Sequence, residues 1–424
     1  MDIHRLTDTS PRRKTIVNYQ LSIVNCQLSI EPLSIVNRIL IFAAAKQRHP
    51  MTTPKIALVK QEVYQDLYVC PTSEKDAGNI LFSSQGRVGP IGLMAELDAD
   101  FYIVHEEPQW ETQIYRKVIP HLAKHLYLLK TQTLDKLPGQ EFKRPGSPHA
   151  NGDFAVSCYA VDWGAYDIVI SINVSLPTRL IRQYPHTLFA YMIGEANMAT
   201  RTARFGYDVT LNQLARGIVA ERCGAVDFPY TFVSGDTLER LLAARLGRPS
   251  KSRGVFMEIN STRERPVTRV PEHFRPLVEE AGQEVLLHRQ LIAENLESIY
   301  DAKYFIKMGG RTIRGNSVAE AISLGTLAIM NRDEVIHKEL ITDACNVKTM
   351  DEAVALVRRL EADPAEYARL LDEQRQNLTR LFFHLPLKSL ANCLKDKRRR
   401  NRPAPYNAVS RVLDHLAFIK GLHF

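Results

Sequence analysis

A cationic turn stands directly before a predicted helix in the stretch "GGRTIRGNSVAEAISLGTLAIM", residues 309–330. Arg311 and Arg314 both lie in this turn. Guanidinium groups bind phosphate oxygens through paired, charge-assisted hydrogen bonds, so two of them close together suit a diphosphate. These residue types therefore predict the binding of an anion.

The residues around the two arginines fit the same chemistry. Gly310 and Gly315 would let the backbone approach an anion closely, because glycine has no side chain and a wide choice of backbone angles. The helix expected to begin near Asn316 or Ser317 offers free N–H groups and a partial positive charge at its start. The stretch thus has the parts of a phosphate cradle.

An ordinary capped turn is the alternative interpretation of this stretch. "SVAE" matches a capping box, in which Ser317 caps the helix and Glu320 reaches back to the Ser317 N–H. The glycines would then only turn the chain. However, the apolar run "KYFIK" (303–307) before the turn reads as a buried strand, and ligands of parallel β/α sheets lie outside the carboxyl ends of strands. This context favours the anion site.

Three further residues of the second half follow predicted strands. Arg263 and Arg265 lie in "INSTRER", which leaves the run "GVFMEI" (254–259), and His288 ends "EVLLH" (284–288). If these strand ends share one sheet edge, the three side chains are candidates for binding the same anion. A solvated loop and a structural histidine are the simpler alternatives.

Candidate general bases lie in the first half of the chain. Glu195 ends the run "TLFAYMIGE", where a carboxylate could deprotonate an acceptor hydroxyl within hydrogen-bond reach. His105 and Glu106 follow "DFYIV" and are weaker candidates. Glu195 could instead cap or pair with the next helix. "DAD" (98–100) precedes a strand, so it is interpreted as a turn, with no metal implied.

Apolar runs and amphipathic segments alternate along the chain, which predicts parallel sheets with helices on both faces. The expected fold class is α/β, with two Rossmann-like β/α domains facing a central cleft. Neither domain has GxGxxG after its first strand, and GxxxxGK[ST] is missing, which disfavours NAD enzymes and P-loop NTPases. The strands are expected at 55–59, 100–104, 166–172, 187–195, 207–213, 254–259, 284–288, 303–307 and 327–330. The helices are expected at 112–126, in 236–253, and at 271–282, 292–301, 317–324, 350–362 and 364–383.

The expected domain organisation follows from these elements. Residues 51–245 are expected to form one β/α domain, 250–385 a second, and 386–424 a helical tail with a basic segment. Residues 1–50 contain the near-repeat "IVNYQLSIVNCQLS", which suggests a translated tandem repeat of DNA. We expect this leader to be disordered or absent from the native product, which would then begin at Met51.

The net charge of +8 is concentrated in two short segments, because residues 1–50 and 388–402 are both strongly basic. The rest of the chain is slightly acidic, which argues against nucleic acid as a partner. The tail "KDKRRRNRP" could contact anionic lipid, although a solvated segment is the commoner case. Six scattered cysteines without metal-ligand spacing indicate a reducing compartment, and hence the cytoplasm.

The stretch "RGNSVAEAISLGTLAIM" resembles the C-terminal half of a GT-B-fold glycosyltransferase, most nearly the exostosin-like and group 1-like variants. The resemblance covers roughly residues 254–385, and it implies that the domain 250–385 binds the nucleotide sugar and that the domain 51–245 lies on the acceptor side. It implies that Ser317 and the Gly315–Asn316 backbone face the diphosphate of a nucleotide-sugar donor. It also implies that Glu320 accepts hydrogen bonds from the ribose and that Gly325 turns the chain into the next strand.

Two positions depart from that family pattern. Retaining members with two glutamates would need an acid at Thr312, and the usual proline after the turn is Ala328. The stereochemistry of transfer, inverting or retaining, is therefore open.

The expected function is the transfer of a sugar from a UDP- or GDP-sugar to a hydroxyl of a glycan or lipid-linked acceptor. The enzyme would be hexosyltransferase-like and independent of metal and other cofactors, and would serve polysaccharide biosynthesis in the cytoplasm or at the membrane periphery. The alternatives are a nucleotide-sugar epimerase of the same fold and a non-catalytic protein that binds nucleotide sugars or glycans.

Overall fold

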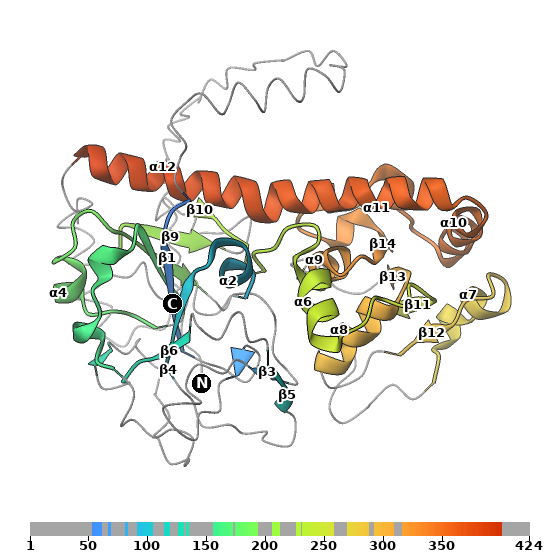
Figure 1. Ribbon diagram of the computed structural model, residues 1–424. Helices are drawn as coiled ribbons and strands as arrows, with labels where there is room; N and C mark the ends of the chain where they lie inside the picture. The colour runs from blue at the N-terminus through green and yellow to red at the C-terminus, as the bar shows by residue number, and fades with distance from the viewer. Residues whose placement is uncertain are drawn as a thin grey trace, which may run out of the picture. The chain divides into compact units, whose positions relative to one another are not determined.

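The computed structural model describes part of the chain, and the elements below belong to that part (Figure 1). It covers residues 53–61, 67–68, 81–83, 91–104, 114–118, 126–130, 133–134, 156–172, 174–193, 206–212, 226–229, 231–257, 269–287, 292–308 and 316–400. The leader 1–50 lies outside these residues, so its absence from the native product stays a prediction.

The first sheet has seven strands, all parallel, in the order β10-β9-β8-β7-β1-β4-β6. The chain starts in the middle at β1, adds strands on one side, then returns to β7 and adds strands on the other, which is a doubly wound arrangement. The strands are β1 (Ile56–Gln61), β4 (Asp100–Val104), β6 (Leu126–Leu128), β7 (Ile168–Ile172), β8 (Leu188–Ile193), β9 (Val209–Asn212) and β10 (Val226–Asp227).

The second sheet has four parallel strands in the order β12-β11-β13-β14. Its strands are short and apolar, and β13 and β14 are buried along their whole length, as expected for strands covered on both faces. The strands are β11 (Val255–Met257), β12 (Val285–Leu286), β13 (Tyr304–Lys307) and β14 (Leu327–Met330). Two parallel sheets confirm the predicted α/β fold class, whereas the domain boundaries and the central cleft stay predictions.

One predicted helix is wrong. Residues 112–126 were expected to be helical, but 114–118 form strand β5 (Ile114–Val118) in a small antiparallel sheet with β2 (Leu67–Tyr68) and β3 (Leu81–Ser83). The β-branched Ile114 and Val118 and the aromatic Tyr115 favour a strand, and Pro120 would interrupt a helix. Helix α2 (Ile91–Leu97), by contrast, was not predicted.

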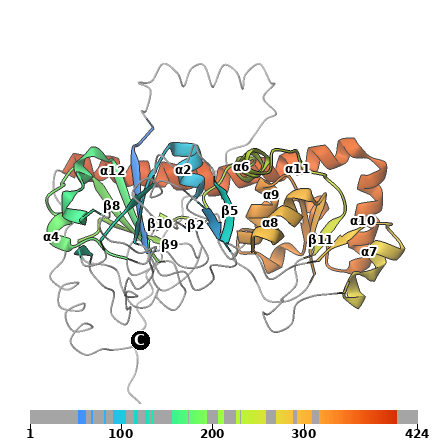
Figure 2. The same cartoon turned by 60° about the horizontal axis from the view of Figure 1, so that its bottom comes forward.

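The helices of the second half follow the predicted pattern closely, and in Figure 2 α8 and α9 lie beside the strands of the second sheet. Besides α2, the helices of the described residues are α4 (Thr178–Ile181), α6 (Thr237–Leu246), α7 (Arg275–Glu279), α8 (Ile292–Asp301), α9 (Asn316–Ser323), α10 (Met350–Ala362), α11 (Pro364–Thr379) and α12 (Leu385–Arg400), with a π-helical turn η11 (Arg380–His384) between the last two. Short 3-10 turns lie at Cys158–Ala160, Trp163–Ala165, Glu272–Phe274, Arg332–Glu334, Lys338–Leu340 and Asp343–Cys345.

The helical run from α11 to α12 packs against both sheets. Helix α11 contacts β14, and α12 contacts β8 and β10. Lys397 of α12 is buried and donates hydrogen bonds to the Asp208 carboxylate and to the Thr187 carbonyl oxygen, each at 2.6 Å. Arg398 pairs with Asp167. These two cations of the basic segment are therefore not simply solvated, because they attach the helix to the amino edge of the first sheet.

The chain that follows α6 is fastened to the end of α8. Arg248 donates two hydrogen bonds to Asp301, at 2.6 and 2.8 Å, and the Lys251 backbone N–H donates a third at 3.2 Å. Burial raises the pKa of the Asp301 carboxyl, but the hydrogen bonds from Arg248 and Lys251 outweigh it and hold the pKa below its ordinary value.

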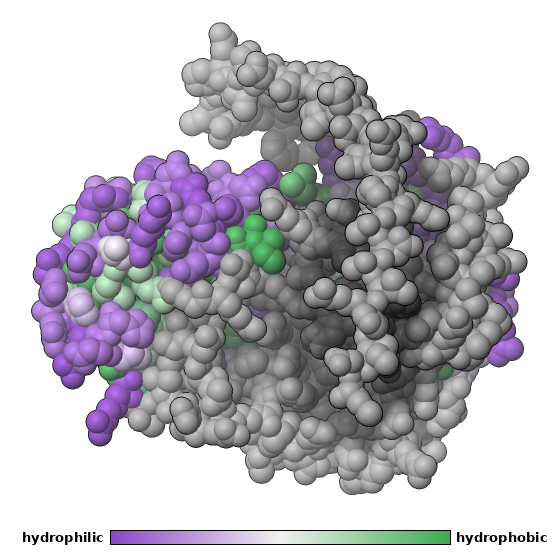
Figure 3. Space-filling model, turned by 180° about the vertical axis from the view of Figure 1, so that it is seen from behind, coloured by the Kyte–Doolittle hydropathy of each residue, from purple (hydrophilic) through white to green (hydrophobic). Residues whose placement is uncertain are grey.

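The described surface seen from behind is mostly hydrophilic, with a few small hydrophobic patches (Figure 3). Within the described part, the large hydrophobic side chains that are exposed are Tyr127, Val156, Tyr159, Val278 and Leu385. No helix among these residues is both long enough and apolar enough to cross a membrane.

Candidate functional site

The second sheet reverses its winding between β11 and β13, which are neighbours although β12 lies between them in sequence. Met257 at the end of β11 and Ile306 near the end of β13 are Cα partners in the parallel register. Ligands of open α/β sheets bind in the crevice at such a reversal, outside the carboxyl ends of the strands. The topology therefore identifies this edge as the candidate site.

Both arginine-bearing segments are joined to this edge. The segment 258–268, with Arg263 and Arg265, follows β11, and the segment 309–315 follows β13. The two segments lie outside the described residues, as do their predicted site residues Gly310, Arg311, Arg314 and Gly315 and also His288, which comes shortly after β12. Their roles stay predictions, but the strands from which they leave are adjacent.

Helix α9 begins at this edge and carries the candidate residues that the structure describes. It starts at Asn316, so Ser317 lies in its first turn, and Glu320 follows about one turn later on the same face. Ser317 is half-buried and Glu320 is 9% exposed. Gly325, with φ of +89°, makes the turn from α9 into β14, as the resemblance implied.

The position of Ser317 bears on the capping-box alternative. A capping box needs the serine to flank the helix, whereas Ser317 lies one residue inside α9. A complete capping box does occur at α10, where Thr349 accepts from the Glu352 N–H and Glu352 accepts from the Thr349 N–H. At α9 the residue before the helix, Gly315, lies outside the described part of the chain, so the capping box and the anion site both stay predictions there.

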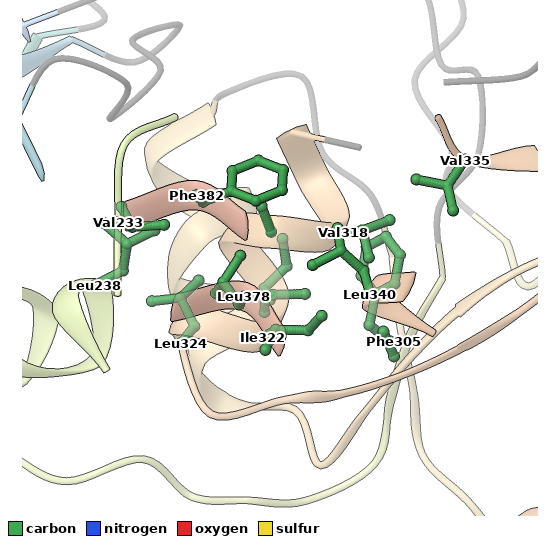
Figure 4. Close-up of a cluster of buried hydrophobic side chains, with 14 of the residues drawn as sticks. Val233, Leu238, Phe305, Val318, Ile322, Leu324, Val335, Leu340, Leu378 and Phe382 are labelled. Carbon is green, nitrogen blue, oxygen red and sulfur yellow. The ribbon is translucent and has the colours of Figure 1, made fainter. Parts of the chain in front are cut away.

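Packing fixes α9 on its remaining sides (Figure 4). Val318 and Ile322 are fully buried, next to Phe305 of β13 and Leu378 of α11 in the hydrophobic cluster drawn there. The Ser323 hydroxyl accepts from the Leu238 N–H at 3.1 Å and donates to the Ser234 carbonyl oxygen at 2.9 Å. A helix held in this way presents its N-terminus in a fixed position, which is the preorganisation that electrostatic stabilisation of an anion needs.

A charged pair that the sequence analysis did not single out lies at the same edge. Lys307, the last residue of β13, has its ammonium 2.6 Å from a carboxylate oxygen of Glu334, and the two side chains are 6% and 17% exposed. The sequence indicates one half of this pair, because Lys307 is a charged residue at the end of an otherwise apolar strand. Its partner comes from the 3-10 turn after β14, which no local pattern predicts.

The candidate bases of the first half follow two different strands of the first sheet. His105 and Glu106 come after β4 and Glu195 after β8, and all three lie outside the described residues. Strands β1 and β7 separate β4 from β8, so at roughly 4.8 Å per strand spacing their carboxyl ends are about 14 Å apart. The strand ends that carry His105 and Glu106 are therefore far from the strand end that carries Glu195, and the topology does not indicate that the three residues act together.

The structure supports the interpretation of residues 98–100 as a turn. Asp98 has a positive φ of +48°, and Asp100 accepts a hydrogen bond from the Tyr166 hydroxyl at 2.7 Å. In the described part of the chain, no three His, Cys, Asp or Glu side chains gather closely enough to hold a metal ion.

Comparison with solved structures finds weak likenesses over most of the chain. No protein-family model matches the sequence, and no curated protein matches it closely enough to count as a relative. The sucrose-phosphate synthase of Thermosynechococcus elongatus is 14% identical, with 82% of this chain and 99% of that one covered and a TM-score of 0.38. Anabaena HepE, solved with UDP and glucose, is 9% identical, with 82% and 100% covered and a TM-score of 0.37. The β-glucosyltransferase of T4 phage is 11% identical, with 81% and 98% covered and a TM-score of 0.34. Scores this low carry no argument about the present chain.

Proposed function

We propose that the protein transfers a sugar from a UDP- or GDP-sugar to a hydroxyl of a glycan or lipid-linked acceptor, as a step of polysaccharide biosynthesis. The observation that supports this most is the start of α9 at the winding reversal of the second sheet, with Ser317 and Glu320 on one helix face. In this proposal the helix start and Arg311, Arg314, Arg263 and Arg265 hold the diphosphate.

The proposed reaction breaks the bond between the sugar and the diphosphate. The leaving diphosphate carries negative charge, which the arginines and the N-terminus of α9 would stabilise without a metal ion. A base from the first half, Glu195 or His105 with Glu106, would remove the proton of the acceptor hydroxyl. We place the reaction in the cytoplasm, with peripheral contact to a membrane carrying the acceptor through exposed cations of α12 such as Lys395 and Arg399.

The proposal is tested by titrating the full chain with UDP- and GDP-sugars and following release of the nucleoside diphosphate with and without glycan acceptors. Turnover that depends on the acceptor supports a transferase. Tight binding without turnover supports the non-catalytic alternative, and no binding of any nucleotide sugar contradicts the proposed function.

Glu320→Gln is expected to weaken the affinity for UDP or GDP roughly five- to tenfold, because a neutral amide replaces the carboxylate that accepts from the ribose hydroxyls. Uridine and guanosine should lose as much affinity as their diphosphates, since all four contain the ribose. Calorimetric titration measures the affinities, and a thermal melt checks that the fold is retained. A lower melting temperature with unchanged affinities would mean that Glu320 has only a structural role.

Arg314→Ala is expected to cost about 1.5–3 kcal/mol of affinity for UDP or GDP, the range for hydrogen bonds to charged groups. The nucleosides, which lack the anion, should bind as they do to the unchanged protein. Arg263→Ala should act in the same sense, because the segments carrying the two arginines leave adjacent strands. Equal losses for nucleoside and diphosphate, or none, would remove the phosphate role from this loop.

A further inference from the structure

Lys307 and Glu334 form a largely buried ion pair at the carboxyl edge of the second sheet, where the candidate site lies. Transfer of an ammonium and a carboxylate from water into a protein interior costs several kcal/mol per ion, and such a pair is often no better for stability than two apolar residues. Stability alone is therefore a weak reason for this pair. The location of Lys307, at the carboxyl end of β13 and shortly before the segment 309–315, suggests another reason.

Glu334 is held firmly before any ligand arrives. Its 3-10 turn is capped by the Asn331 side chain, which accepts from the Asp333 N–H at 3.0 Å. The Arg332 N–H next to it donates to the Asn346 side chain, also at 3.0 Å. These bonds hold the backbone of the turn that carries Glu334, and the carboxylate pairs with Lys307 while it is 17% exposed. Little reorganisation of the turn would be needed for the ammonium to meet an anion.

We propose that Lys307 is a donor-binding residue whose ammonium, positioned by Glu334, binds the diphosphate of the donor. The inference rests on the proposed function. It adds Lys307, a residue of strand β13 itself, to the residues that bind the donor diphosphate. The pair holds the ammonium of Lys307 at the carboxyl end of β13, 2.6 Å from Glu334. In a partly buried site the attraction of the ammonium for a phosphate is screened less than in water.

The same strand supplies a matched control. Lys303 directly precedes β13 at the opposite, amino edge of the sheet, and its ammonium lies 2.7 Å from Glu361. The two lysines thus have similar partners and distances, although the Lys303 side chain is the more exposed, at 20%. Ligands of parallel β/α sheets gather at the carboxyl edge only. Removal of the two charges should therefore have different effects on anion binding.

The experiment compares Lys307→Met, Lys303→Met and the unchanged chain in calorimetric titrations with UDP, GDP, inorganic pyrophosphate and uridine. Lys307→Met is expected to weaken UDP, GDP and pyrophosphate by about tenfold to a hundredfold and uridine by less than about twofold. Lys303→Met should leave all four unchanged. Lys307→Arg should restore part of the loss, because it keeps the charge.

A second variant covers the case in which Lys307→Met unfolds. Lys307→Met combined with Glu334→Leu replaces the buried pair by apolar side chains, a change that proteins often tolerate, and it should show the same selective loss of anion affinity. If the folded variants bind UDP and pyrophosphate as tightly as the unchanged chain does, Lys307 has only a structural role and the inference is wrong. The proposed function would still stand in that case. If the unchanged chain binds neither the nucleotides nor pyrophosphate, the proposed function fails and the inference fails with it.

Discussion

Gln374→Leu is expected to lower the free energy of unfolding by about 2–6 kcal/mol, counting roughly 1–3 kcal/mol for each buried backbone group left without a partner. Gln374 of α11 is fully buried, and its amide accepts from the Ala328 N–H at 2.9 Å and donates to the Ala328 carbonyl oxygen at 2.8 Å. Ala328 lies in β14, the edge strand of the second sheet. The glutamine therefore takes the place of a further strand, and leucine cannot do so.

Urea unfolding of the full chain measures this effect, and Gln376→Leu is the matched control on the same helix. Gln376 is exposed, and its side-chain amide donates to the Asp372 carboxylate within α11, at 2.6 Å. Loss of this amide should change the free energy of unfolding by less than about 0.5 kcal/mol. Equal effects of the two variants would show that Gln374 does not support the edge strand.

The contact of Gln374 also explains a departure from the family pattern. Sequences that the stretch 314–330 resembles usually have a proline where this chain has Ala328. Proline has no N–H, so it could not donate to the Gln374 side chain, whose oxygen would be left buried and unpaired. The backbone N–H of Ala328 in strand β14 is thus needed by Gln374 of helix α11.

Lys397→Met is expected to destabilise the chain by about 3–5 kcal/mol, because it leaves a buried carboxylate without its cation. Asp208 is 6% exposed and also accepts from the Phe189 N–H at 2.8 Å. The double variant Lys397→Met with Asp208→Asn should recover much of the loss, since asparagine is neutral and keeps an acceptor for Phe189. Urea unfolding measures both.

Lys395→Met serves as the control for this prediction, because Lys395 is exposed on the same helix. It should leave the unfolding midpoint nearly unchanged, and so should the loss of any cation that only faces solvent. If Lys397→Met and Lys395→Met had the same small effect, α12 would not depend on the buried pair for its attachment to the first sheet.

Local patterns in the sequence predicted much of the fold. Strands β4 and β14 and helices α8 and α10 have the predicted bounds. Strands buried on both faces have continuous apolar runs, and amphipathic helices have apolar residues with a period of 3.6. Both patterns can be recognised within a short stretch of the sequence. The small antiparallel sheet was missed because β2, β3 and β5 are stabilised by pairing with one another, and the helical spacing of 112–126 was given more weight than the strand propensity of residues 114–118.

The candidate site likewise has a part that the sequence predicted and a part that only the tertiary structure decided. The order of strand, glycine-containing turn and helix with Ser317 and Glu320 is a local feature, so the sequence by itself was enough to propose a donor site there. Which strand ends are neighbours was decided by the winding of the sheet, which brings β11 next to β13. The roles of Lys307, Gln374 and Lys397 were likewise decided only by tertiary structure, because their partners lie 27, 46 and 189 residues away in the chain. A buried charge or amide acquires its role from the group that it meets, and only folding brings that group to it.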